Sequence, residues 1–131
     1  MSTIQLSEFQ KQVSELLLRH RSLLDVLSKY DQSNASVHRS IIKAITECGC
    51  VEVNGKKQQY APEMTLDEAK DTLETHMSGE LCDTCLEAVS AEFGKNLFYM
   101  SSLCNLLNID LEEVIEREMK KCSTLGLFNL S

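Results

Sequence analysis

Apolar residues recur at intervals of three and four along most of the chain, which is the spacing of one face of an α-helix. The apolar positions of the first two runs are Phe9, Val13, Leu16, Leu17, Leu24 and Leu27, and then Val37, Ile41, Ile42, Ile45 and Cys48. We expect helices over residues 7–30 and 35–48. The turn between them is placed at residues 31–34, where Asp, Ser and Asn side chains can bond to the backbone. Gly49 is expected to end the second helix.

Three further patterns place helix starts. In a capping box, Ser, Thr or Asp at the N-cap and Glu or Gln three residues later bond to each other's backbone N–H groups. The three pairs are Ser7 with Gln10, Thr65 with Glu68, and Asp110 with Glu113. They predict the first helix, a third helix after Thr65 and a last helix after Asp110.

A long fourth helix is expected to begin near Leu81 and to end at the break formed by residues 108–110. Its apolar face carries Cys82, Cys85, Leu86, Val89, Phe93, Leu97, Met100, Cys104 and Leu107. The pattern predicts an all-α fold, a helical bundle of about five helices built on a long antiparallel pair. An irregular excursion over residues 51–81 separates helices two and four; it holds a short extended piece at Val51–Val53 and a turn at Asn54–Gly55, so a hairpin there is an alternative.

Composition agrees with a globular helical protein. The chain has 131 residues, enough for a single domain over residues 1–131 with its own core. Hydrophobic residues make up 43% and charged residues 25%, and one Pro and five Gly leave few turn signals for an all-β fold. The net charge of -7 repels phosphate backbones and anionic lipids, so we expect neither nucleic-acid nor membrane binding.

The first residues, Met1–Gln5, lack the basic and apolar regions of a signal peptide, and Leu16–Leu18 is too short an apolar run to cross a bilayer. These features predict a cytoplasmic protein. Thiols stay reduced in that compartment, so paired cysteines are interpreted first as metal ligands or redox groups rather than as disulfides.

Four of the six cysteines occur as two close pairs, Cys48 with Cys50 and Cys82 with Cys85. A structural zinc ion takes four such ligands in a tetrahedron, usually as two pairs. The second pair is spaced i and i+3 near a helix start, where the helix dipole favours thiolates. The first pair is spaced i and i+2, which suits a chain that turns at Gly49. We therefore predict a zinc clip that closes the base of the excursion.

Other interpretations of these cysteines stay open. An iron–sulfur cluster uses the same ligands. Reduced cysteines are often plain core residues, and the second pair, Cys82 and Cys85, could also serve as a thiol redox sensor. Among the remaining candidates, His76 could substitute as a ligand, whereas Cys104 and Cys122 are single and are expected to be structural.

A resemblance to a known family rests on the second half. From residue 92 the chain reads Glu-Phe-Gly-Lys-Asn-Leu-Phe-Tyr-Met-Ser-Ser-Leu-Cys-Asn-Leu-Leu-Asn-Ile-Asp-Leu-Glu-Glu-Val-Ile-Glu. This stretch resembles the C-terminal half of the MazG-like all-α nucleoside triphosphate pyrophosphohydrolases, with their Glu-x-x-Asp motif, Asn-Ile-Asp break and Leu-Glu-Glu helix. The resemblance is clear over about residues 92–121 and faint over residues 35–52. It implies a MazG-like domain, a nucleotide as ligand and, together with the apolar tail at Leu127 and Phe128, a homodimer.

In that family, carboxylates on two facing helices hold Mg²⁺, which binds the triphosphate and activates water. Of five such positions, Glu47 and Glu92 match, whereas Thr46, Cys50 and Lys95 replace carboxylates. Lys95 lies at i+3 from Glu92, so its ammonium could pair with Glu92 or remain a solvated surface charge. The prediction is a non-catalytic binding or regulatory module with an incomplete Mg²⁺ site. The alternative is an active pyrophosphohydrolase with an altered metal site.

Overall fold

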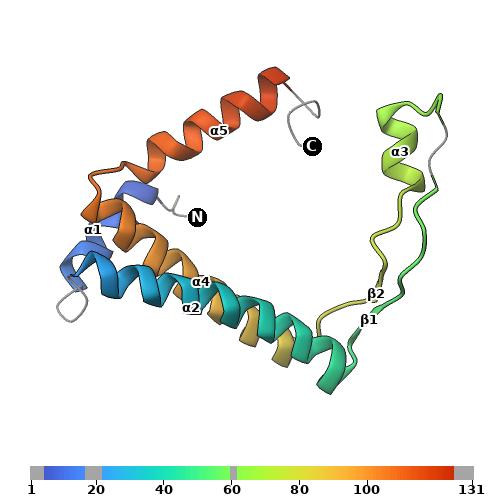
Figure 1. Cartoon of the computed structure of the whole chain (residues 1–131), viewed down its shortest axis with the longest axis horizontal. Helices are drawn as coiled ribbons and strands as arrows, with labels where there is room; N and C mark the ends of the chain where they lie inside the picture. Colours follow the sequence, from blue (N-terminus) through green and yellow to red (C-terminus); the bar gives the residue numbers. More distant parts are fainter. Residues whose placement is uncertain (1–4, 17–21, 60–61, 126–131) are drawn as a thin grey trace. The chain divides into compact units, whose positions relative to one another are not determined.

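The computed structural model describes residues 5–16, 22–59 and 62–125 (Figure 1). The elements in chain order are α1 (Leu6–Leu16), α2 (Leu23–Lys43), the π-helical turn η1 (Ala44–Cys48), β1 (Val51–Val53), α3 (Leu66–Thr72), β2 (Met77–Gly79), α4 (Asp83–Leu106) and α5 (Leu111–Leu125). Five α-helices and one two-stranded sheet in the described parts confirm the predicted all-α class. None of the described helices is both long and apolar enough to cross a membrane.

The chain divides into two compact units. Residues 1–37 and 92–131 form what we call the terminal unit, and residues 38–91 form the central unit. The part of α2 up to Val37 and the part of α4 from Glu92 belong to the terminal unit, and the other parts of both helices belong to the central unit. Each unit is described by itself below.

The predicted turn at residues 31–34 is wrong, because α2 runs through this stretch without interruption. Ser33 is buried and its hydroxyl donates to the carbonyl of Tyr30 at 2.7 Å, a bond that a helix can accommodate. The amide of Asn96 on α4 donates to Ser33 Oγ at 3.0 Å and also to Asn34 Oδ1. A partner helix thus satisfies the polar side chains that would otherwise favour a turn. In the described parts the first helix is seen as α1 over Leu6–Leu16, and α2 begins at Leu23; residues 17–21, over which one continuous helix was expected, lie outside the described residues.

The capping boxes have different outcomes. The box at the start of α3 is confirmed, since Glu68 N donates to Thr65 Oγ1 at 3.2 Å and Thr65 N donates to Glu68 Oε2 at 3.3 Å. Asp110 also caps its helix, and its Oδ1 accepts from Glu112 N at 3.0 Å. The box at the first helix is wrong, because the Gln10 side chain turns to a distant part of the chain instead.

Gln10 joins α1 to the break between α4 and α5. Its Nε2 donates to Asn105 Oδ1 at 3.1 Å and to the carbonyl of Ile109 at 2.9 Å, and its Oε1 accepts from Leu111 N at 2.8 Å. The Asn105 amide donates back to the Gln10 carbonyl at 2.9 Å. Asn108 takes the left-handed conformation (φ 56°) that ends α4. One side chain therefore caps α5 and holds the break. The buried residues described in the terminal unit lie on α1, α2, α4 and α5: Val13, Val26, Ser33, Ser101, Ser102 and Leu111.

In the central unit, β1 and β2 pair antiparallel in the register Val51↔Gly79, Glu52↔Ser78 and Val53↔Met77. The expected tight turn at Asn54–Gly55 is therefore wrong, and the strand that pairs with β1 comes after α3. The pairing continues irregularly beyond the strands, since Asn54 N donates to the His76 carbonyl at 2.8 Å. Further along, the side chain of Gln58 makes the two backbone bonds that a paired strand would otherwise make. Its Nε2 donates to the Glu74 carbonyl at 2.7 Å and its Oε1 accepts from Glu74 N at 3.0 Å.

Replacing Gln10 by Ala should remove three side-chain hydrogen bonds and leave the N–H of the buried Leu111 without its acceptor. We expect the free energy of unfolding to fall by about 1–3 kcal/mol, because a desolvated donor without a partner costs more than the bond itself contributed. Urea unfolding followed by circular dichroism measures this. Gln12→Ala, an exposed glutamine on the same helix, is the matched control and should change stability by less than about 0.5 kcal/mol. Equal effects of the two variants would contradict the role given to Gln10.

Candidate metal centre

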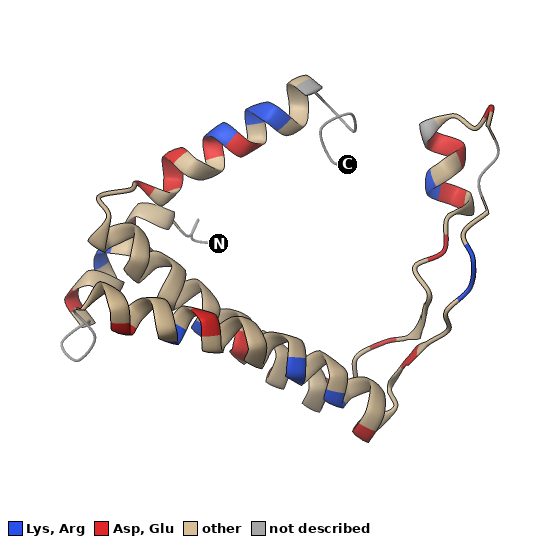
Figure 2. Ribbon diagram, in the orientation of Figure 1, with Lys and Arg blue, Asp and Glu red and all other residues tan. Residues whose placement is uncertain are grey.

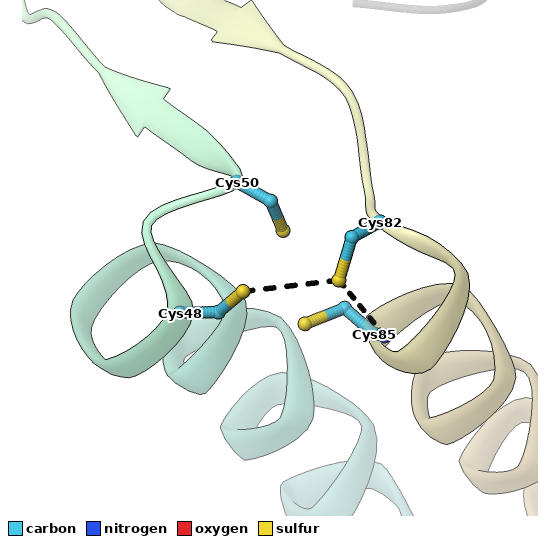
Figure 3. A group of neighbouring side chains, drawn as sticks. All are labelled: Cys48, Cys50, Cys82 and Cys85. Atoms are coloured by element: carbon cyan, nitrogen blue, oxygen red, sulfur yellow. Dashed lines mark hydrogen bonds between the residues drawn. The ribbon is translucent and has the colours of Figure 1, made fainter.

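Four cysteine sulfurs converge at the base of the excursion, within the central unit. The Sγ atoms of Cys48, Cys50, Cys82 and Cys85 all lie within 4.8 Å of one another. Figure 3 shows that the first pair comes from the end of η1 and the start of β1, and that the second pair comes from the start of α4. All four side chains point toward a common centre. Among the described residues this is the one group of three or more Cys, His, Asp or Glu close enough to share a metal ion.

The first pair is positioned by a helix that widens and then stops. At its C-terminal end α2 passes into η1, where Gly49 N donates to the Ala44 carbonyl at 2.9 Å, five residues back. Gly49 has φ 78°, a left-handed conformation that side chains rarely adopt. The chain therefore reverses between Cys48 and Cys50, so two residues spaced i and i+2 present their sulfurs to the same side. This confirms that Gly49 ends the second helix.

The second pair is positioned by the N-terminus of α4. Cys82 directly precedes the helix, and its Sγ accepts a hydrogen bond from Cys85 N at 3.4 Å. The sulfur thus occupies the place of an N-cap acceptor, which is normally an oxygen of Ser, Thr or Asp. Cys85 lies one turn on and is half-buried. Sequence reasoning put both residues on one helix face but did not foresee that Cys82 would cap the helix.

Sulfur spacing fits a tetrahedral thiolate site. Two thiolates bound to one zinc ion at about 2.3 Å lie about 3.8 Å apart when the site is tetrahedral. The Sγ atoms of Cys48 and Cys82, one from each pair, are 3.8 Å apart. A disulfide would need about 2.05 Å, and all six cysteines are free thiols. The donor set and its spacing match a metal better than a crosslink.

The thiols of Cys48, Cys82 and Cys85 differ in pKa. The backbone N–H of Cys85, followed by its thiol, stabilises the thiolate of Cys82 and lowers the Cys82 pKa from 9.0 to about 7. The same contact with Cys82 raises the pKa of Cys85 to about 12, with a smaller contribution from burial. Hydrogen bonding with Cys82 also raises the pKa of Cys48. Without a metal ion, Cys82 is the thiol of the cluster that ionises near neutral pH. A divalent ion bound by the other cysteines must displace the protons of their thiols.

The remaining candidate ligands lie elsewhere. His76 does not join the cysteines, because its Nε2 lies 2.6 Å from the Lys56 carbonyl within the excursion. Cys104 is half-buried on α4, where burial raises its pKa, and Cys122 is exposed on α5. The structure thus separates the four paired cysteines from the two single ones, in the way their spacing predicted.

The carboxylate positions implied by the family resemblance are divided between the units. Glu47 lies in η1 of the central unit and is exposed, whereas Glu92 and Lys95 lie on α4 in the terminal unit. Lys95 Nζ is 3.6 Å from Glu92 Oε1, so of the two alternatives left open by their i, i+3 spacing the structure has the ion pair. The Lys95 side chain is 66% exposed, so water screens this pair and its contribution to stability is small.

Glu92 and Lys95 line a shallow polar depression of about 190 Å³ between α2 and α4 of the terminal unit. Its lining residues are Lys29, Gln32, Ser33, Ser36, Glu92, Lys95 and Tyr99. Sequence reasoning missed Lys29, because only the pairing of α2 with α4 brings it close to Glu92. The lining contains a single carboxylate and two ammonium groups, whereas a Mg²⁺ site requires several oxygen ligands and negative charge.

Comparison with protein-family models, with curated protein sequences and with solved structures gave no match to this chain. The resemblance to MazG-like pyrophosphohydrolases therefore stays a prediction. The interpretation of the site rests on its own geometry.

The lowered pKa of Cys82 can be measured directly. In reduced, chelator-treated protein we expect a thiolate to form as pH rises through about 7, seen as an increase in ultraviolet thiolate absorbance. The Cys82→Ser variant should lose this step, because Cys82 is the thiol whose pKa the neighbouring hydrogen bonds lower. Cys122→Ser, which removes an exposed thiol outside the cluster, should keep it. A step near pH 7 that survives in Cys82→Ser would contradict the assignment.

Proposed function

We propose that this protein is a non-catalytic binding module whose recognition element, the excursion of residues 51–81, is held in shape by a structural zinc ion on Cys48, Cys50, Cys82 and Cys85. The observation that carries the proposal is the convergence of four thiols from two distant segments on one centre. Reduced thiols in this number suit a cytoplasmic protein. A MazG-like ancestry is compatible with the helical framework but is not needed for the argument.

Zinc suits this site better than the other occupants. It accepts four thiolates in a closed tetrahedron, and a site without an open position is structural rather than catalytic. Among the described residues four cysteines and no fifth ligand share the centre, since His76 bonds to the Lys56 carbonyl. An iron–sulfur cluster would use the same four thiols, and its iron content and visible absorbance distinguish it.

The excursion needs such a clip because it has little core of its own. Among the described residues between Val51 and Leu81, only Val51 is buried. Backbone bonds made by Gln58 and His76 and the capping box of α3 give it local order. Closing its base with a metal lowers the entropy of the unfolded chain, as any crosslink across a long loop does.

Exposed apolar side chains on the ordered excursion support a role in recognition. Val53 and Met77 face each other across the sheet and are 59% and 55% exposed. Two apolar side chains that are cross-strand neighbours in a two-stranded sheet stay in contact with water unless a binding partner covers them. This is the feature of a binding surface rather than of a spacer.

The absence of catalysis is supported by the electrostatics of the polar depression. Glu92 is its single carboxylate, and Lys95 lies beside it at 3.6 Å. A lysine in the place of a metal-binding carboxylate repels a divalent cation, and the three lining hydroxyls and the one amide cannot replace the lost charge. We therefore assign no hydrolytic chemistry to this depression.

Metal content tests the clip. Protein purified without a histidine tag should contain about one zinc per chain by elemental mass spectrometry. Cys48→Ser and Cys82→Ser should both lose it, whereas Cys104→Ser and Cys122→Ser, which alter the two cysteines outside the cluster, should retain it. Removing the metal by chelation should speed hydrogen exchange of the β1 and β2 amides and leave α1 and α5 unchanged. No metal in the parent protein, or equal loss in all four variants, would refute the clip.

Nucleotide turnover tests the absence of catalysis separately. We expect no hydrolysis of any common nucleoside triphosphate with Mg²⁺ or Mn²⁺, because the site lacks the required carboxylates. The opposite result would be turnover that Glu92→Gln abolishes and Glu87→Gln, an exposed glutamate further toward the N-terminus of α4, leaves intact. That outcome would establish the enzyme alternative and would not affect the zinc clip.

A further inference from the structure

The backbone itself holds the two cysteine-bearing segments side by side at the cluster. Val51 directly follows Cys50 and pairs with Gly79 across the sheet. Gly79 has φ 85°, and a side chain at this position would collide with the Cys50 carbonyl oxygen. Gly79 in turn precedes Cys82 by three residues. The strand pairing therefore contributes to the proximity of the two pairs, whatever the sulfurs bind.

One sulfur of each pair contacts the other pair. Figure 3 shows Cys48 and Cys82 with their sulfurs facing each other, and the two Sγ atoms are 3.8 Å apart. A disulfide bond is about 2.05 Å long, so these sulfurs need to approach each other by only about 1.8 Å to form one. Rotation about the single bonds of the two side chains supplies a movement of that size. A covalent bond between the pairs therefore requires no separation of the strands.

Solvent reaches one member of the cluster more readily than the others. Cys48 is exposed, whereas the other three cysteines are half-buried. An oxidant that arrives from water therefore meets the Cys48 sulfur first, and the sulfur in contact with it is that of Cys82. A disulfide inside the first pair would close a ring over Gly49 alone, which the geometry of the bond disfavours. Exposure and contact together favour a bond between the pairs.

The surroundings of the cluster favour an uncharged oxidant. Residues 44–55 and 77–91 contain five acidic residues, all of them exposed, and no Lys or Arg. Figure 2 shows acidic residues on both segments at the base of the excursion. Their carboxylates repel an anionic oxidant, whereas a neutral hydroperoxide is not repelled. The five residues are Glu47, Glu52, Glu80, Asp83 and Glu87.

We propose that Cys48 and Cys82 are a site of oxidative modification, at which a neutral hydroperoxide replaces the zinc clip by a disulfide between the same two segments. The loss of zinc rests on the proposed function above, whereas the disulfide rests on the sulfur geometry alone. The disulfide closes the same loop of 35 residues from Cys48 to Cys82 as the metal does. The excursion therefore stays closed at its base after the zinc has left.

One hydroperoxide is consumed for each disulfide. Zinc holds its cysteine ligands as thiolates, and the Cys48 thiolate attacks the outer oxygen of the hydroperoxide. The O–O bond breaks, and the other oxygen leaves as an alcohol, or as water from hydrogen peroxide, with a proton from solvent. The Cys82 thiolate then attacks the sulfur of the Cys48 sulfenic acid, and hydroxide leaves as water with a second proton. Two thiolates lose two electrons to the peroxide, and a zinc ion left with two of its four ligands dissociates.

Mass spectrometry of the full-length, metal-loaded chain carrying Cys104→Ser and Cys122→Ser tests the disulfide. These substitutions remove the two thiols outside the cluster, so each remaining thiol belongs to it. Hydrogen peroxide should lower the mass of the chain by two hydrogen atoms. Trypsin cleaves after Lys and Arg and therefore places the first pair in the peptide 44–56 and the second pair in the peptide 71–95. We expect these two peptides to be joined, and a chromogenic chelator to detect zinc release at the same rate.

Further single substitutions in this background identify the two cysteines. Cys48→Ser and Cys82→Ser should each slow the joining of the peptides at least about tenfold, because the reacting sulfurs are no longer in contact. Cys50→Ser and Cys85→Ser are the matched controls, since they leave that contact in place and should still form the joined peptides. All four variants are compared in the metal-free state, so that differences in zinc binding do not affect the rates.

Hydrogen exchange tests whether the excursion stays closed. After oxidation, the amides of β1 and β2 should keep the slow exchange of the zinc-loaded protein. Chelation of the reduced protein should instead speed their exchange, because neither metal nor disulfide then closes the loop. Exchange after oxidation that is as fast as exchange after chelation would overturn the inference that the disulfide replaces the clip.

The zinc content of the untreated protein separates this inference from the proposed function. Zinc-containing protein that gives no joined peptides, or only a disulfide within one peptide, overturns the inference and leaves the zinc clip intact. Equal rates of joining in Cys48→Ser and Cys50→Ser also overturn it, because the assignment of the reacting sulfur would be wrong. Protein without zinc refutes the clip, whereas joined peptides formed from it on oxidation would still establish the disulfide.

Discussion

The central unit depends on one constraint, the convergence of four sulfurs within 4.8 Å at the base of the excursion. Two local devices produce it. The left-handed Gly49 reverses the chain after η1, and the N-terminus of α4 draws in the sulfur of Cys82 through Cys85 N–H. If a metal joins the two pairs, it closes a loop of 35 residues from Cys48 to Cys82, a constraint of roughly 4 kcal/mol in the chain-entropy view. That magnitude can order a segment with almost no buried side chains.

The terminal unit follows a different principle. Its α2–α4 pair carries a polar depression, in which Glu92 and Lys95 form their ion pair. The proposed function takes Lys95 to stand where the enzymes that the chain resembles have a metal-binding carboxylate, a position from which its ammonium repels a divalent ion. Both units thus enter the proposed function, the central unit through its four cysteines and the terminal unit through its polar depression.

Local sequence patterns predicted the structure correctly where the polar side chains found their hydrogen-bond partners within the same helical turn. Thr65 and Glu68 satisfy each other within one turn, so their capping box formed as predicted. Ser7 and Gln10 carry the same signal, but Gln10 bonds instead to Asn105, Ile109 and Leu111, roughly a hundred residues away. The turn expected at residues 31–34 failed for the same reason, because Asn96 on another helix satisfies Ser33 and Asn34. A polar side chain adopts the conformation that lets it bond to its strongest available partner. The spacing of residues in the sequence shows only those partners that are close along the chain.

The sequence by itself determined the all-α class, the end of the second helix at Gly49 and the identity of the four clustered cysteines. Periodicity, glycine conformation and ligand spacing are properties of a few neighbouring residues. Only the tertiary structure decided that the excursion closes with β1 on β2, that Cys82 caps α4, and that Lys29 lines the same depression as Glu92. Each of these depends on the packing of segments far apart in the chain, and long-range packing selects among local alternatives that are nearly equal in free energy.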